Sequence, residues 1–366
     1  MSNINDFIIE NETLIKYNGS DAEVVIPDGV KVIGKSAFEK NNTITKVVLS
    51  NGVIQLDYCA FYNCQLLQEV VLSNSVEVIG KDAFRSCVSL GNVVFGDSVT
   101  AIGEFAFCDC HSLKTVDLPY STTQIESGAF SSCHSLEKII IPNHVLSIGS
   151  GAFRWCYSLR KVDIPDSVVS FGEDRYWPGM VFADCTSLEM ITIPKSIAYI
   201  CKGTFSNCEK LKEVIIEGEK VRLGETAFDK CPSLEKIVFK GNNIECYKTF
   251  GAGLPLLKVF LAKELYTKKS SISAYIIPYL AVEGDSDFAG LWMHQSGKSW
   301  DEWFAKQTFD ASTVLCAIAD LLRGKKITDK KIARVQQFAD KYSSSLSCEL
   351  VSEIMNSLHS DGKKSV

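Results

Sequence analysis

Residues 136–156 read LEKIIIPNHVLSIGSGAFRWC, and this arrangement of apolar residues recurs through most of the chain. Its phenylalanine recurs every 23 residues, with one longer interval of 29 residues. The series is Phe38, Phe61, Phe84, Phe107, Phe130, Phe153, Phe182, Phe205 and Phe228. A fixed period of about 20 to 50 residues is typical of a solenoid, in which each repeat forms one turn. We call each repeat a rung and name it by its phenylalanine.

Each rung places the same residue types at the same distances from its phenylalanine. Leucine lies six residues later, as in Leu136, and aliphatic residues lie nine and eleven later, as in Ile139 and Ile141. The alternation at nine and eleven predicts a short strand with one buried face. A proline often follows, as in Pro142, and ends the strand because it cannot donate a hydrogen bond. One rung cannot bury its apolar residues alone, so stacking is predicted to create a continuous core.

Cysteine lies three residues after the phenylalanine in eight rungs. Stacking therefore predicts a column of buried free thiols, which behave as small apolar residues. Disulfides between adjacent rungs are the alternative, and they would require an oxidising compartment. No CxxC pair is present, and the sequence predicts no metal site and no cofactor.

One column of residues is predicted to point away from the core on the strand face. It lies ten residues after each phenylalanine and includes Val94, Asp117, Ile140 and Asp163. The column is more apolar than an exposed position requires. Strand propensity alone favours such residues, and a ligand-binding surface is the alternative explanation.

A six-residue insertion lengthens the interval between Phe153 and Phe182, in the stretch 173–180, EDRYWPGM. Insertions in repeats map to loops on one face, often the binding face. This loop contributes Arg175, Tyr176 and Trp177, and the preceding rung contributes Trp155 and Tyr157. Residues of these types dominate interaction hot spots. We therefore predict a binding cluster here; the alternative is that the rings cover a gap in the core.

The core string resembles the BspA-type leucine-rich repeats over residues 24–261. This resemblance implies a leucine-rich-repeat solenoid, mainly β with short irregular turns. It also implies an adhesion or interaction module, often on a bacterial surface. The composition of the chain adds two expectations. The formal net charge of −6 argues against general nucleic-acid binding, and no apolar run is long enough to span a membrane. As written, the N-terminus lacks a signal sequence, which predicts a cytoplasmic protein; the resemblance allows a surface or secreted one.

The period divides the chain into four predicted parts. Residues 1–23 form an N-terminal cap, 24–262 the solenoid, 263–286 a connector and 287–366 a C-terminal helical cap or module. In the last part, helices are predicted over Ala311–Arg323, after Thr328, and over Ser347–Leu358.

These features favour a non-catalytic scaffold that binds an unidentified protein partner through the strand face and the 173–180 loop. Adhesin-like binding of a host or glycan ligand is one alternative, and a purely structural solenoid is another. A third is an enzyme with its site in the C-terminal helical region or at Asp117 and Asp163, whose separation of roughly 10 Å suits a glycosidase pair. The sequence supplies no feature that would desolvate one of these two carboxyl groups.

Overall fold

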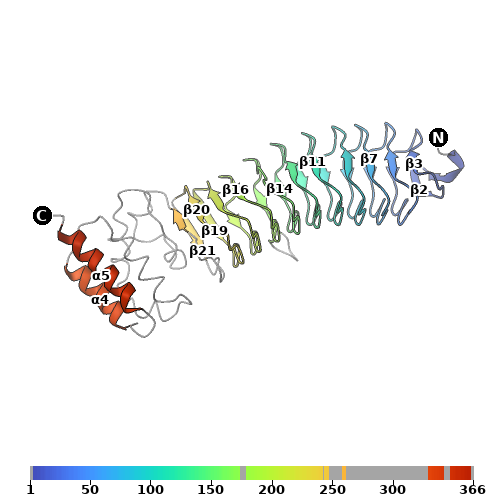
Figure 1. Cartoon of the computed structure of the whole chain (residues 1–366). Helices are drawn as coiled ribbons and strands as arrows, with labels where there is room; N and C mark the ends of the chain where they lie inside the picture. Colours follow the sequence, from blue (N-terminus) through green and yellow to red (C-terminus); the bar gives the residue numbers. More distant parts are fainter. Residues whose placement is uncertain are drawn as a thin grey trace. The chain divides into compact units, whose positions relative to one another are not determined.

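The computed structural model describes residues 3–173, 179–241, 243–246, 258–260, 329–341 and 347–363. Contacts divide the chain into two compact units, Met1–Leu257 and Lys258–Val366. The first unit is a β-solenoid in which the short strands of successive rungs lie side by side (Figure 1). This confirms the predicted solenoid class.

An antiparallel hairpin begins the first unit. The short helix η1 (Ile4–Asp6) leads into β1 (Phe7–Glu10), which pairs with β2 (Thr13–Tyr17). Asn11 and Glu12 form the turn with φ of 46° and 63°, the left-handed values that two-residue hairpin turns favour. Phe7 meets Tyr17 in a tilted contact, and Tyr17 stacks on Phe38, so the cap extends the aromatic core of the solenoid.

The predicted strands form the first of two parallel ladders, which carries the strand face. It is divided among three sheets. Isolated bridges of Lys161 with Lys138 and of Asp163 with Thr192 connect the second of these sheets to the third. Its strands are β3 (Glu23–Val25), β5 (Lys46–Val48), β7 (Glu69–Val71), β9 (Asn92–Val94), β11 (Thr115–Asp117), β13 (Lys138–Ile140), β16 (Met190–Ile193), β18 (Glu213–Ile216) and β20 (Lys236–Phe239).

The second ladder lies just before the phenylalanine of each following rung. Most of its strands have two residues, and the hairpin joins it through β2. They are β4 (Val32–Ile33), β6 (Gln55–Leu56), β8 (Val78–Ile79), β10 (Ala101–Ile102), β12 (Gln124–Ile125), β14 (Ser147–Ile148), β15 (Ser170–Phe171), β17 (Tyr199–Ile200), β19 (Lys220–Leu223) and β21 (Asn243–Cys246).

The segment around each phenylalanine closes the rung without strand or helix, and we call its solvent side the turn face. In the Phe61 rung, the N–H groups of Cys59, Phe61 and Asn63 donate to carbonyl oxygens of the next rung. The alternate N–H groups close tight turns within the segment. This geometry repeats, because the residues two before and two after each phenylalanine have φ between 53° and 64° in all nine rungs. Left-handed backbone favours glycine, asparagine and aspartate and is strained for bulky side chains.

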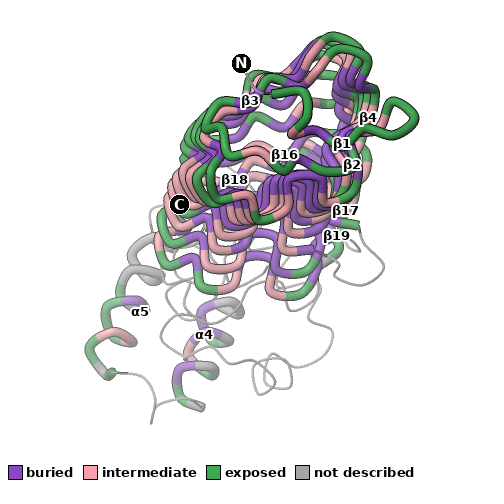
Figure 2. Tube along the Cα trace, turned by 90° about the vertical axis from the view of Figure 1, so that its right-hand side faces the viewer, coloured by how far each residue is buried: buried purple, intermediate pink, exposed green. Residues whose placement is uncertain are grey.

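Buried positions of successive rungs line up along the stack (Figure 2). They include a column of phenylalanines and a column of cysteines, together with aliphatic residues. The nine repeat phenylalanines are fully buried, and successive ring centroids lie 4.6 to 5.8 Å apart in stacked geometry. The eight repeat cysteines have no exposed surface and are free thiols. The predicted thiol column is therefore confirmed for the described residues.

The second unit contributes β22 (Lys258–Phe260) and two packed helices, α4 (Asp329–Lys341) and α5 (Cys348–Lys363). Their buried residues include Ile332, Val335 and Ile354, as the predicted apolar faces require. The predicted connector 263–286 and helix Ala311–Arg323 lie outside the described residues. Within the described ranges, no helix is long and apolar enough to cross a membrane. The predicted domain boundaries stay predictions.

Candidate interaction surface

The strand face presents apolar side chains to solvent at the predicted column. Val94 and Ile140 are 45% and 44% exposed, whereas Ile139 and Ile141, on either side of Ile140, are buried. This contrast follows from the pleat, which turns successive side chains to opposite faces. The column is not one uninterrupted sheet, because β9 and β11 belong to different sheets.

The two acidic residues of this column are also exposed. Asp117 pairs in register with Ile140, and Asp163 forms an isolated bridge with Thr192. The Asp163 carboxylate lies 3.0 Å from the Lys161 ammonium, and its side chain is 83% exposed. Neither aspartate is buried, so neither lies in the apolar pocket that a glycosidase general acid occupies.

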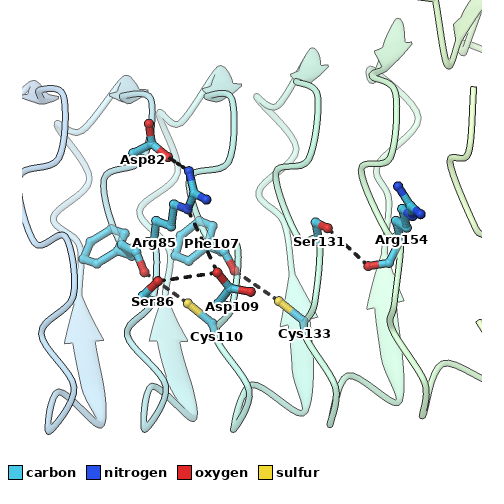
Figure 3. Close-up of polar contacts among 10 residues, drawn as sticks. Asp82, Arg85, Ser86, Phe107, Asp109, Cys110, Ser131, Cys133 and Arg154 are labelled. Carbon is cyan, nitrogen blue, oxygen red and sulfur yellow. Dashed lines mark hydrogen bonds and ion pairs between the residues drawn. The ribbon is translucent and has the colours of Figure 1, made fainter. Parts of the chain in front are cut away.

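The turn face carries two arginines, three rungs apart, each immediately after a repeat phenylalanine. Arg85 contacts Asp82 at 3.1 Å and lies 4.0 Å from Asp109, which also accepts a hydrogen bond from Ser86 (Figure 3). Its guanidinium lies over the ring of Phe105, 5.3 Å from the centroid. The network connects neighbouring rungs and holds Arg85 between two carboxylates, of which that of Asp82 is almost completely buried.

Arg154 has a different environment. Its guanidinium carbon lies 3.8 Å from the centroid of the Trp155 ring, a close cation–π contact. Arg154 forms an ion pair with Asp184, whose carboxylate oxygen lies 3.7 Å from Nε, beyond hydrogen-bond distance. Asp184 itself accepts a 2.8 Å hydrogen bond from Asn207. The Nε atoms of Arg154 and Arg85 are alike in being buried, and no acceptor among the described residues bonds to either.

Three rings stack on one another at the position four residues after the phenylalanine. His111 and His134 lie with centroids 4.2 Å apart, and His134 lies 4.8 Å from Tyr157. Tyr157 is 42% exposed. Burial lowers the pKa of His134, and the neighbouring His111 lowers it further by like-charge repulsion.

A second aromatic contact lies between the two ladders. The rings of Tyr120 and His144 meet edge to face at 3.9 Å, and Tyr120 is 69% exposed. Five of the other eight rungs place asparagine or aspartate at the Tyr120 position, and five place serine at the His144 position. Ser75, Ser121 and Ser167 there donate to the carbonyl oxygen of the preceding rung. His144 therefore stands where these rungs have a serine that bonds to the neighbouring rung.

The structure brings together only part of the predicted site. Trp155 and Tyr157 lie on the turn face of one rung, whereas Val94, Asp117, Ile140 and Asp163 lie on the strand face. Arg175, Tyr176 and Trp177 lie outside the described residues. The ring stack and the guanidinium on Trp155 were missed. Comparing each column for residues that depart from its usual type would have found them.

The thiol column and the histidines do not combine into a metal site. Cys110 and Cys133 point into the core, while His111 and His134, next to them in sequence, lie at the surface. Among the described residues, no three histidine, cysteine or acidic side chains are placed to hold a metal ion.

Several solved structures resemble this chain. A leucine-rich cell surface protein of Faecalibacterium prausnitzii is 24% identical, with a TM-score of 0.48 over 69% of this chain and 86% of that one. A leucine-rich repeat protein of Bacteroides ovatus is 20% identical, with a TM-score of 0.49 over 74% and 79%. The leucine-rich repeat protein of T. pallidum is 25% identical, with a TM-score of 0.39 over 64% and 90%.

No curated protein matches the chain. The model of the BspA-type leucine-rich repeat region, which comprises six copies, matches residues 8–133, 78–178 and 178–270. These matches cover most of the chain and include every phenylalanine of the repeat series. The chain belongs to the BspA-type leucine-rich repeat family.

Proposed function

We propose that this protein is a non-catalytic interaction scaffold that binds a partner protein through its strand face and the 173–180 loop. The family suggests a protein-interaction or surface scaffold role. The observation that carries the finer proposal is the exposure of Val94 and Ile140 on a ladder whose adjacent residues form the core. Exposed aliphatic residues on a rigid face supply apolar area for binding at little cost in conformational entropy.

The test compares two faces of the same solenoid. Val94→Lys/Ile140→Lys places charge on the strand face, and Ile54→Lys/Leu146→Lys places it at equally exposed positions beside the second ladder. Proteins crosslinked to the full-length chain would be quantified by mass spectrometry, with a photoreactive group at Thr115. We expect the first pair to reduce capture of a defined partner at least tenfold and the second pair to leave it unchanged. Equal capture by both would reject the strand face. Capture of a glycan in place of a protein would favour the adhesin-like alternative.

A further inference from the structure

The rung of Phe153 differs in charge from every other rung. The eight residues that follow Phe153, RWCYSLRK, include Arg154, Arg160 and Lys161 and no acidic residue, for a formal charge of +3. The equivalent segments of the other rungs range from −2, after Phe182, to +1, after Phe38 and Phe84. The repeat provides its own comparison, because these segments occupy the same place in the same backbone. The fold therefore does not require this charge.

These cations retain much of their capacity to bind an anion. Arg160 is exposed, and no carboxylate among the described residues forms an ion pair with it, although Glu137 and Glu189 precede and follow it in its column. Lys161 is 63% exposed, and among the described residues its ion pair is with Asp163. Lys161 also lies directly beside Lys138 in the parallel ladder. Like charges at such positions destabilise a sheet, and an anionic partner would relieve the repulsion.

Arg154 is the most specific of the three. The Trp155 ring holds its guanidinium by a cation–π contact, and its ion pair with Asp184, at 3.7 Å, is too long for a hydrogen bond. A planar guanidinium presents donors whose geometry matches a carboxylate, so a fixed one loses little entropy on binding it. Arg85 provides the contrast, since Asp82 already accepts a hydrogen bond from it.

The backbone of Trp155 supplies an independent observation. Its φ is 62°, in the left-handed region, where the other rungs place lysine, asparagine, serine or aspartate. A bulky side chain in this conformation is unusual, and such strain concentrates at functional sites. The strained residue is also the one that orients Arg154.

We propose that Arg154, Trp155 and Arg160 form a subsite for carboxylate side chains in an acidic segment of the protein partner. Lys161 adds to its positive potential. The proposal rests on the scaffold function, and it specifies the chemistry of the partner. The overall charge of the chain, −6, would oppose general anion binding, so the subsite must act locally.

The probe is a fluorescein-labelled peptide of twelve glutamates, and binding to the full-length protein is followed by anisotropy at several salt concentrations. We expect Arg154→Gln/Arg160→Gln to weaken binding at least tenfold. The matched control, Lys114→Gln/Lys212→Gln, removes the same charge from the Arg160 column in other rungs and should weaken it less than threefold. Arg154→Lys keeps the charge but lacks the planar donors. Its affinity for the peptide should therefore lie between the affinities of the wild type and of Arg154→Gln.

Three results would overturn the subsite: no binding by the wild type, equal loss in both double variants, or tighter binding of a polygalacturonate oligomer than of the peptide. The last result would identify an acidic glycan. Circular dichroism melts would confirm that each variant folds. If the subsite fails while Val94→Lys/Ile140→Lys still abolishes partner capture, the scaffold function stands without it.

Discussion

The thiol of Cys133 donates a hydrogen bond to the carbonyl oxygen of Phe107 in the preceding rung, at 3.2 Å. The same contact recurs in all eight repeat cysteines at 3.0 to 3.3 Å. The phenylalanine carbonyl also accepts the N–H of the cysteine in its own rung. Cysteine fits this position because it is small and apolar yet has a weak donor. The two core columns are thus coupled from rung to rung.

Removing one ring of the aromatic stack should destabilise the solenoid locally. Phe130 is fully buried between Phe107 and Phe153, with centroid distances of 5.4 and 5.8 Å. We expect Phe130→Ala to lower the free energy of unfolding by about 3–5 kcal/mol. Hydrogen exchange should accelerate mainly in the Phe107, Phe130 and Phe153 rungs, because each rung contacts only its neighbours. Unchanged unfolding would contradict the role of the stack, and uniform loss of protection would contradict its local character.

The buried thiols should make the protein sensitive to alkaline pH. Burial raises the pKa of Cys201 to about 11 and that of Cys108 and Cys231 to about 12. An unfolded thiol ionises near pH 8.5, so the folded state retains protons that the unfolded state releases. The stabilisation is complete below that pH and is lost as pH rises toward the folded values. The free energy of unfolding should fall by about 1.4 kcal/mol per pH unit for each such thiol.

Urea denaturation at pH 7.5, 9 and 10 would measure this slope, with reductant present throughout. Cys201→Ala should make the slope shallower by about one thiol's contribution. If the free energy of unfolding did not change with pH above pH 9, the thiols would not be held protonated by burial in the folded state. Rapid labelling of most thiols in the native state at pH 7.5 would contradict their burial directly.

The core was largely predictable from the sequence, because periodic residues such as Phe130 and Cys133 repeat the same chemical requirement. The contacts at the surface were less predictable from the sequence. His111 and His134 occur one rung apart in sequence, but their stacking depends on backbone geometry that the spacing alone does not specify. The cation–π contact of Arg154 joins neighbours in sequence whose relative orientation depends on the left-handed φ of Trp155. The predicted role of Trp177 stays a prediction.

The histidine stack should have a measurable titration. Burial lowers the pKa of His134 first, and repulsion from His111 lowers it further. We expect His111→Gln to raise the pKa of His134 toward its usual value, as measured by NMR on labelled histidine. The remaining depression from burial should persist. Since the folded state disfavours the charged ring, the free energy of unfolding should fall as pH decreases from the unfolded pKa of about 6.5 through the lower folded pKa of His134. An unaltered pKa in the variant would mean that the rings do not stack in solution.

Trp155→Asn should separate the functional role of this residue from its structural role. Asparagine occupies the same position at Asn63 and Asn207 and tolerates left-handed backbone. The substitution relieves about 1 kcal/mol of backbone strain and removes a cation–π contact with Arg154 of about 0.5–1 kcal/mol. The free energy of unfolding should therefore change by no more than about 1 kcal/mol. Binding of the partner or the glutamate peptide should nevertheless fall, because Arg154 loses the ring that orients it. A loss of stability above about 3 kcal/mol would instead show that Trp155 is a structural plug.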